Sequence, residues 1–155
     1  MSIPPADSDV GRARPTVAVL CVVIDDDRVA LVRRANPPDA GYWGFPGGKI
    51  EFGETITQAA ERELDEETSL VGDAIGVLTT IDAFDRGTDG DLVSHFVLIA
   101  VACQWRSGSL RAGDDALEAG WFALDEVDDA QLALSKDVVD VARYAVAVAQ
   151  NEVRA

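Results

Sequence analysis

The strongest constraint on how this chain folds is a run of acidic residues between positions 61 and 67. Five of these seven positions carry a carboxylate: Glu61, Glu63, Asp65, Glu66 and Glu67. Like charges three and four residues apart on a helix repel each other, at a cost of roughly 0.2–0.5 kcal/mol for each pair. A fold accommodates such a cluster more easily when a positive charge lies among the carboxylates.

The spacing around this run predicts one helix. Thr55 and Gln58 form a Thr-x-x-Gln capping box, which predicts that the helix starts near Thr55. Apolar residues then recur every four positions, at Ile56, Ala60 and Leu64, and form the stripe that an amphipathic helix turns toward a core.

Three of the glutamates are predicted to face inward from this helix. Glu63, Glu66 and Glu67 stand at i, i+3 and i+4, so their carboxylates converge on one side, within or beside the apolar stripe. A buried carboxylate must be paired, protonated or bound to a metal. Convergent carboxylates are hard oxygen ligands, which suit Mg²⁺ or Mn²⁺. Glu61 and Asp65 fall on the other side and are interpreted as solvated charges.

The alternative interpretation is a charged helix face exposed to solvent, which is the commoner origin of such a pattern. The preceding segment favours a ligand site instead. Phe45-Pro46-Gly47-Gly48 and Gly53 are interpreted as a glycine-rich turn that leads into the helix. Glycine allows a backbone to approach a ligand closely, so a carbonyl of this turn is a candidate for a further metal ligand.

At these residues the sequence resembles the Nudix hydrolases, whose box reads G-x5-E-x7-R-E-U-x-E-E-x-G-U, where U is a bulky apolar residue. Eight of the nine specified positions match: Gly48, Glu54, Arg62, Glu63, Leu64, Glu66, Glu67 and Leu70. The departure is Ser69, at a position just past the helix where glycine usually takes the left-handed conformation. Serine there costs about 1–2 kcal/mol if that geometry is kept. The resemblance extends more weakly over residues 15 to 130.

The resemblance implies hydrolysis of the pyrophosphate bond in a nucleoside diphosphate that is linked to another group. It also implies the ligands of the divalent metal, Mg²⁺ or Mn²⁺: Glu63, Glu66, Glu67 and the carbonyl of Gly47. Arg62 would orient the glutamates through charge-assisted hydrogen bonds, and Glu54 would support the metal shell. Such a metal neutralises pyrophosphate oxygens and lowers the pKa of the attacking water. The general base stays open between Glu63, Glu66 and an acid of a later loop.

Other candidates come from the segments around the box. Arg33 and Arg34 end a predicted strand, and either one is a candidate for binding a substrate phosphate as a bidentate donor; the alternative is a surface charge at the end of a strand. Trp43 leads into the glycine-rich turn. It is a candidate wall of the substrate pocket, although packing into the core beneath the turn is slightly favoured.

Two acids and one histidine complete the set of candidates. The resemblance implies that an acid a few residues before Trp121 assists catalysis or metal binding. Asp115 and Glu118, in a predicted acidic loop over residues 113–118, are the two candidates. His95, the single histidine of the chain, is interpreted as a structural strand residue.

The remaining pattern predicts an α/β fold with a mixed sheet between helical layers, which the resemblance specifies as the Nudix α/β/α sandwich. Strands are predicted at 16–24 and 29–33 around a turn at 25–27, at 74–84 and 92–105, and at 120–124. An amphipathic helix is predicted over 134–153, with apolar residues at Val138, Val141, Ala142, Tyr144, Ala145 and Val148. Residues 1–14 are expected to form a flexible tail before a single domain at 15–155.

The net charge of −15 argues against a surface for nucleic acid or anionic membrane, which needs clustered Lys and Arg. It does not argue against a small phosphate substrate, because a bound metal reverses the local sign. Cys21 and Cys103 are expected to be reduced core thiols of a cytoplasmic protein. The chain has neither the apolar segment of a signal peptide nor a run long enough to span a membrane. Many relatives are dimers, so a homodimer stays open.

Within the family, the segment from Arg33 to Trp121 most resembles bacterial ADP-ribose-type pyrophosphatases, so ADP-ribose or a similar nucleotide sugar is the favoured substrate. The proline that many ADP-ribose enzymes carry some fifteen residues beyond the box is missing around Asp85 and Arg86. The first alternative is a (deoxy)nucleoside triphosphate pyrophosphohydrolase. The second is a non-catalytic Nudix module that senses a nucleotide.

Overall fold

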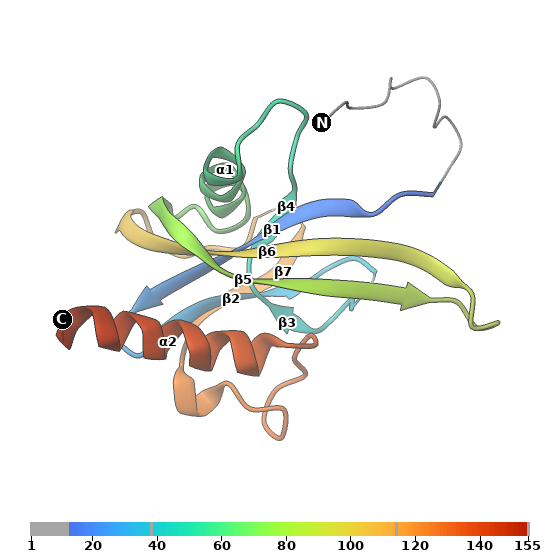
Figure 1. Ribbon diagram of the computed structural model, residues 1–155. Coiled ribbons are helices and arrows are strands. Elements are labelled where there is room, and N and C mark those ends of the chain that lie inside the picture. Colours follow the sequence, from blue (N-terminus) through green and yellow to red (C-terminus); the bar gives the residue numbers. More distant parts are fainter. Residues whose placement is uncertain (1–12, 38, 114, 155) are drawn as a thin grey trace.

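The computed structural model describes residues 13–37, 39–113 and 115–154 (Figure 1). The tail expected at residues 1–14 lies outside this range except for its last two positions. The strands are β1 Thr16–Asp25, β2 Arg28–Arg34, β3 Trp43–Gly44, β4 Gly47–Lys49, β5 Val71–Arg86, β6 Leu92–Ser107 and β7 Ala116–Ala123. The helices are α1 Ile56–Thr68 and α2 Val138–Arg154, with a short 3₁₀ turn, η2, at Leu124–Glu126.

The strands form a mixed sheet in which β1 is central. The order is β3-β2-β1-β6-β5, with β4 paired to β1 and β7 paired to β2. The β1–β6 pair is parallel, with Val19 opposite Ile99, and the other pairs are antiparallel. Helix α1 covers one face of the sheet and α2 the opposite face (Figure 1). The predicted mixed sheet between helices is therefore confirmed. No helix among the described residues is long and apolar enough to cross a membrane.

Alternate residues of β1 supply two separate cores. Beneath α1 lie Val19, Cys21 and Val23. Toward α2 lie Leu20, Val22 and Ile24. Both cysteines are free and buried, as expected, and the Cys21 thiol donates to the carbonyl of Ala60 in α1 at 3.1 Å. A strand that packs on both faces fixes both helix layers, because side chains alternate between its two sides.

Helix α1 begins and ends as its sequence predicts. The Thr55 side chain accepts from the Gln58 N–H at 3.0 Å, and the Gln58 side chain accepts from the Thr55 N–H at 3.0 Å. At the other end Ser69 is left-handed, with φ 61° and ψ 12°, and its N–H donates to the Asp65 carbonyl at 2.9 Å. Serine thus keeps the geometry that glycine usually provides at this position.

Three predicted boundaries are wrong. Gly47 and Gly48 belong to strand β4 rather than to a turn, since they pair with Leu20 and Val19 of β1. The last strand begins at Ala116, not at residue 120, because β7 already pairs with β2 there, with Ala116 opposite Arg34. The C-terminal helix begins at Val138, not at residue 134: Asp137 has a φ of 70°, a conformation that cannot continue a right-handed helix.

Two details of the flanking elements also differ from the predictions. Tyr144 is 51% exposed and does not belong to the buried face of α2, where Val146 takes that role at 2%. Strands β5 and β6 are longer than predicted. Because Thr16 at the start of β1 lies opposite Phe96, the ribbon formed by residues 84–86 and 92–95 extends past β1.

Replacing Ser69 with glycine is expected to stabilise the protein. A left-handed L-residue costs roughly 1–2 kcal/mol, and the extra freedom of glycine in the unfolded chain offsets about 0.5–1 kcal/mol of that gain. The net effect should raise Tm by roughly 2–4 °C for a chain of this size, measured by calorimetry. A Tm for Ser69→Gly at or below wild type contradicts the prediction.

Thr55→Ala removes the N-terminal cap of α1 and should lower the stability of the protein by about 1 kcal/mol.

Candidate active site

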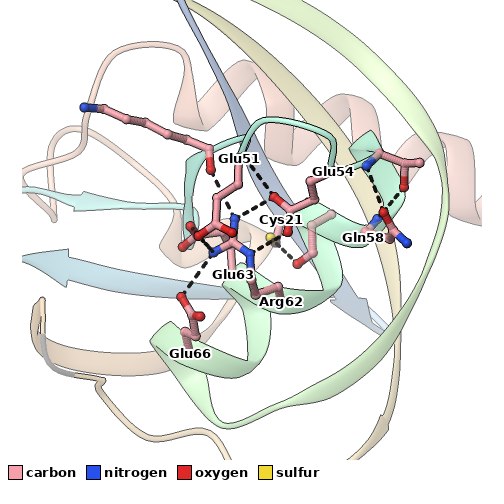
Figure 2. A network of polar contacts seen from close by, with 10 residues as sticks. Cys21, Glu51, Glu54, Gln58, Arg62, Glu63 and Glu66 are labelled. Atoms are coloured by element: carbon pink, nitrogen blue, oxygen red, sulfur yellow. Dashed lines mark hydrogen bonds and ion pairs between the residues drawn. The ribbon is translucent and has the colours of Figure 1, made fainter.

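The guanidinium of Arg62 donates hydrogen bonds to three carboxylates (Figure 2). Its Nε and Nη2 donate to the two oxygens of Glu54 at 2.6 and 2.8 Å, a bidentate pair. Its Nη1 donates to Glu63 at 2.8 Å and to Glu66 at 3.2 Å. Nη2 also donates to the carbonyl of Lys49 at 3.1 Å. This arginine is the positive charge that the acidic run requires, and it ties α1 to the loop that precedes it.

That loop is held in one shape by its own backbone. The Glu51 N–H donates to the Glu54 carboxylate at 3.1 Å, and the Glu54 N–H donates to the Glu51 carbonyl at 2.9 Å. Gly53, with a φ of +87°, completes the turn. The hydrogen bonds from Arg62 and from the Glu51 backbone lower the pKa of Glu54 from 4.5 to about 2. The pKa of Arg62 is raised in turn, mainly by its bond to Glu54.

Glu63 packs against strand β4 where no side chain would fit. A Cβ at Gly48 would lie 2.4 Å from Glu63 Oε1, and a Cβ at Gly47 would lie 2.0 Å from the carbonyl oxygen of Val19. Gly48 therefore lets Glu63 of α1 approach β4 closely, and Gly47 lets β4 approach β1 closely. Burial raises the pKa of Glu63, although its bond to Arg62 acts in the opposite direction.

Glu67 is the carboxylate placed deepest beside β4. Its Oε2 accepts from the Gly47 N–H at 3.2 Å. Burial raises its pKa to about 7, and that hydrogen bond opposes the shift. The charges of Glu63 and Asp115 raise the same pKa, whereas the charge of Arg34 lowers it. Asp115 and Arg34 therefore belong to the surroundings of Glu67.

The inward orientation predicted for the three glutamates holds for two of them. The side chain of Glu63 is 12% exposed, and Glu67 is partly buried. The Glu66 side chain is 59% exposed, because its position borders the apolar stripe and does not lie within it. Within the described ranges, no three His, Cys, Asp or Glu side chains lie close enough together to hold one ion as they stand.

The donor set nevertheless fits a hard divalent cation. All three side chains offer carboxylate oxygens, and they come from one turn of one helix. Burial disfavours the ionised forms of Glu63 and Glu67, as their raised pKa values indicate. A nearby positive charge favours the ionised form of a carboxylate. A cation at this position would therefore stabilise the ionised carboxylates of Glu63 and Glu67, which burial alone disfavours.

Strand β2 separates the two candidate arginines. Ala30 packs beneath α1, and Leu31 packs toward α2. Alternation therefore puts Arg34 on the α1 face with the glutamates and Arg33 on the opposite face. Arg33 Nε donates to the Gly41 carbonyl at 3.0 Å.

The two candidate acids are also separated. Glu118 lies in strand β7, directly opposite Arg33, and not in the predicted loop; its Oε1 is 3.6 Å from Arg33 Nη1. Asp115 lies in the loop before β7 and acts on Glu67. The charge of Asp115 therefore acts on Glu67, whereas Glu118 is in an ion pair with Arg33.

Trp43 and His95 have structural surroundings. Trp43 packs against the core on the α2 side, with its ring 4.9 Å from that of Phe122 in an edge-to-face contact. His95 lies on the part of β6 that extends past β1. Its ring is 4.5 Å from that of Phe84, and its Nε2 is 3.7 Å from Asp82. These contacts support core packing for Trp43 and a structural role for His95.

The sequence patterns missed two polar contacts. Glu61, interpreted as a solvated charge, accepts from the Ala74 N–H at 3.0 Å and so ties α1 to β5. Asn36, which no pattern singled out, donates from Nδ2 to Asp115 Oδ1 at 3.4 Å. Both contacts join segments that are distant in the sequence, so no local spacing indicates them.

Comparisons with known proteins agree with this geometry. Residues 14–142 match a family model described as a NUDIX domain. The chain is 34% identical over 130 residues to an ADP-ribose pyrophosphatase of Methanocaldococcus jannaschii, covering 84% of this chain and 75% of that protein. It is 31% identical over 113 residues to an oxidized purine nucleoside triphosphate hydrolase of Danio rerio, covering 73% and 69%. A MutT NUDIX hydrolase structure from Burkholderia pseudomallei aligns with a TM-score of 0.73 at 28% identity, covering 84% and 98%.

Glu54→Gln is expected to weaken the protein near neutral pH and to matter less in acid. The pKa of Glu54 in the fold is about 2 instead of 4.5. Its contribution to stability is therefore present above pH 4.5 and is lost as the pH falls toward 2. Urea unfolding at about pH 6 and about pH 3 measures the difference. Glu152→Gln, at an exposed position of α2, is the control. A deficit of Glu54→Gln that does not shrink in acid argues against this ion pair.

Proposed function

The chain belongs to the Nudix hydrolase family, and from that premise we propose that it is a divalent-metal-dependent pyrophosphohydrolase. The proposed substrate is a nucleoside diphosphate linked to another moiety, with ADP-ribose or a similar nucleotide sugar as the best candidate. The observation that carries the proposal is the arrangement of Arg62 with Glu54, Glu63 and Glu66, beside the partly buried carboxylate of Glu67. We further propose that the protein acts in the cytoplasm, which its free cysteines support.

The proposed metal ligands are the carboxylates of Glu63, Glu66 and Glu67 and the carbonyl of Gly47. A bound Mg²⁺ or Mn²⁺ would neutralise pyrophosphate oxygens and lower the pKa of the attacking water. Arg62 holds Glu63 and Glu66 by charge-assisted hydrogen bonds, which fix the direction of their oxygens. The rigid turn that carries Glu54 in turn fixes Arg62.

The proposed roles of Arg34 and Asp115 depend on where each residue lies relative to the glutamates. Arg34 would donate to a phosphate oxygen, because it lies on the face of the glutamates and its charge acts on Glu67. Among the loop acids, Asp115 is the better candidate to accept a proton from water, because Glu118 is paired with Arg33. Glu63 and Glu66 remain alternatives for that proton transfer.

Two alternatives concern the substrate and the activity. A (deoxy)nucleoside triphosphate is the first, favoured by the similarity to a protein named oxidized purine nucleoside triphosphate hydrolase. The similarity to a protein named ADP-ribose pyrophosphatase is higher and covers more of this chain, so a nucleotide sugar ranks above it. A module that only senses a nucleotide ranks last, because all the box glutamates are present.

A substrate panel tests the proposal. With Mg²⁺, we expect turnover of ADP-ribose or another nucleotide sugar to exceed that of dinucleoside polyphosphates and (deoxy)nucleoside triphosphates. EDTA should abolish it, since the metal supplies the activated water. Chromatography of the products measures both effects. Preference for a triphosphate would select the first alternative, and no turnover of any compound would refute the enzymatic proposal.

Glu66→Gln and Glu67→Gln should each lower turnover by at least about 10²-fold, as expected when a metal ligand or its activated water is lost. A second readout is independent of activity. Mg²⁺ at millimolar levels should raise the Tm of the wild type, because a ligand that binds the folded state stabilises it, and should raise that of Glu67→Gln much less.

His95→Ala is the control for both measurements. It should keep most of the activity and the full response of Tm to Mg²⁺, because His95 contacts Phe84 and Asp82 rather than the glutamates. Near-wild-type turnover in both glutamine variants would remove the assignment of the metal ligands. A loss in His95→Ala as large as theirs would reverse the structural interpretation of that residue.

A further inference from the structure

The loop between β6 and β7 is attached to the C-terminal end of α1, the helix that carries the glutamates. The Gly113 N–H donates to the carbonyl of Glu67 at 2.8 Å, and the Arg111 N–H donates to the carbonyl of Thr68 at 2.9 Å. A Cβ at Gly113 would lie 2.3 Å from the carbonyl oxygen of Glu66. This side of the loop is therefore in direct backbone contact with α1, two residues before Asp115.

The other side of the loop is attached to the segment between β2 and β3, called segment 35–42 and described at residues 35–37 and 39–42. The Ala35 N–H donates to the carbonyl of Asp115 at 3.2 Å. The Asn36 amide donates to the carboxylate of Asp115 at 3.4 Å. Both the backbone and the side chain of Asp115 thus take hydrogen bonds from this one segment.

Segment 35–42 is in turn held by Arg33. The Nε of Arg33 donates to the carbonyl of Gly41 at 3.0 Å, and its Nη1 pairs with Glu118 at 3.6 Å. Backbone hydrogen bonds join the end of the segment to the end of β2. The Gly41 N–H donates to the Arg34 carbonyl at 2.8 Å, and the Arg34 N–H donates to the Tyr42 carbonyl at 2.9 Å. Gly41 has a φ of +85°, which glycine adopts without strain.

We propose that segment 35–42 positions Asp115 beside the catalytic glutamates, with Asn36 as the positioning residue that contacts it and Arg33 as the anchor of the segment. The inference rests on the proposed function. It assigns Arg33, first considered as a phosphate ligand, to holding the segment, since two of its nitrogens are engaged on the face opposite the glutamates.

Positioning and stability are separable here. The Arg33–Glu118 pair is exposed, with 40% and 57% of the side-chain surfaces accessible, and exposed ion pairs contribute little to stability. A small displacement of a catalytic group, in contrast, lowers the rate strongly. Loss of either positioning residue should therefore lower kcat while Tm and KM change little.

The first experiment is a double-mutant cycle between Asn36 and Asp115, measured as kcat and KM on the best substrate. Asn36→Ala should lower kcat about tenfold, a fraction of the rate that a general base supplies, with KM within about twofold. Asn36→Asp should be worse, because it cannot donate and places a second carboxylate beside Asp115. In an Asp115→Asn background the same Asn36→Ala change should alter kcat less than about twofold, because the partner is gone.

The second experiment compares Arg33→Lys with Arg33→Ala. Lysine keeps the positive charge and can donate from its single ammonium to the Gly41 carbonyl or to Glu118, so it should retain part of the kcat that alanine loses. Arg106→Ala is the matched control: Arg106 is a similarly exposed arginine, 54% accessible, paired with Asp73 between β6 and β5. It should keep the wild-type kcat.

Each outcome separates this inference from the proposed function. Absence of turnover in the wild type refutes both. With an active wild type, a normal kcat in Asp115→Asn, or effects of Asn36→Ala and Asp115→Asn that multiply, overturns the positioning of Asp115 alone. A fall in Tm without a fall in kcat for Arg33→Ala overturns the role of the anchor.

Discussion

The bond between Arg62 and Glu54 is the interaction on which the rest of the site depends. Glu54 belongs to the loop after β4, and Arg62 lies in the second turn of α1, so the bidentate pair sets how the helix leaves the sheet. The third nitrogen of the same guanidinium donates hydrogen bonds to Glu63 and Glu66. A lysine has one ammonium on a flexible stem and cannot reproduce this planar fork.

Glu67 is not among the carboxylates that Arg62 binds, so its protonation is set by other groups. It has the N–H of Gly47 as its near partner and a pKa raised mainly by burial. A carboxylate kept partly desolvated weakens the metal-free fold, and it gains the most when a cation arrives. The Gly47 N–H that Glu67 binds belongs to β4, which lies close against β1 because Gly47 has no Cβ to meet the Val19 carbonyl oxygen.

Local signals explain what the sequence predicted well. Thr55 and Gln58 are three residues apart, so the start of α1 can be predicted from a single turn of the sequence. Partners distant in sequence explain the rest. The start of β7 depends on pairing with β2, and the start of α2 depends on a left-handed Asp137. Arg33 and Arg34 were indistinguishable because β2 is apolar on both faces, with Ala30 and Leu31 in different cores. A strand buried on both sides carries no alternating pattern.

The parallel pairing of β1 with β6 has a consequence for how the protein is made. Residue 19 lies opposite residue 99, so the strand beneath the glutamate helix stays without this neighbour until most of the chain has left the ribosome. Contacts this distant in sequence slow folding, because a long loop must close before they form. The segment that carries Asp115 emerges later still. Fragments that end before β6 therefore hold every box residue and lack the strand that joins β1 to β5.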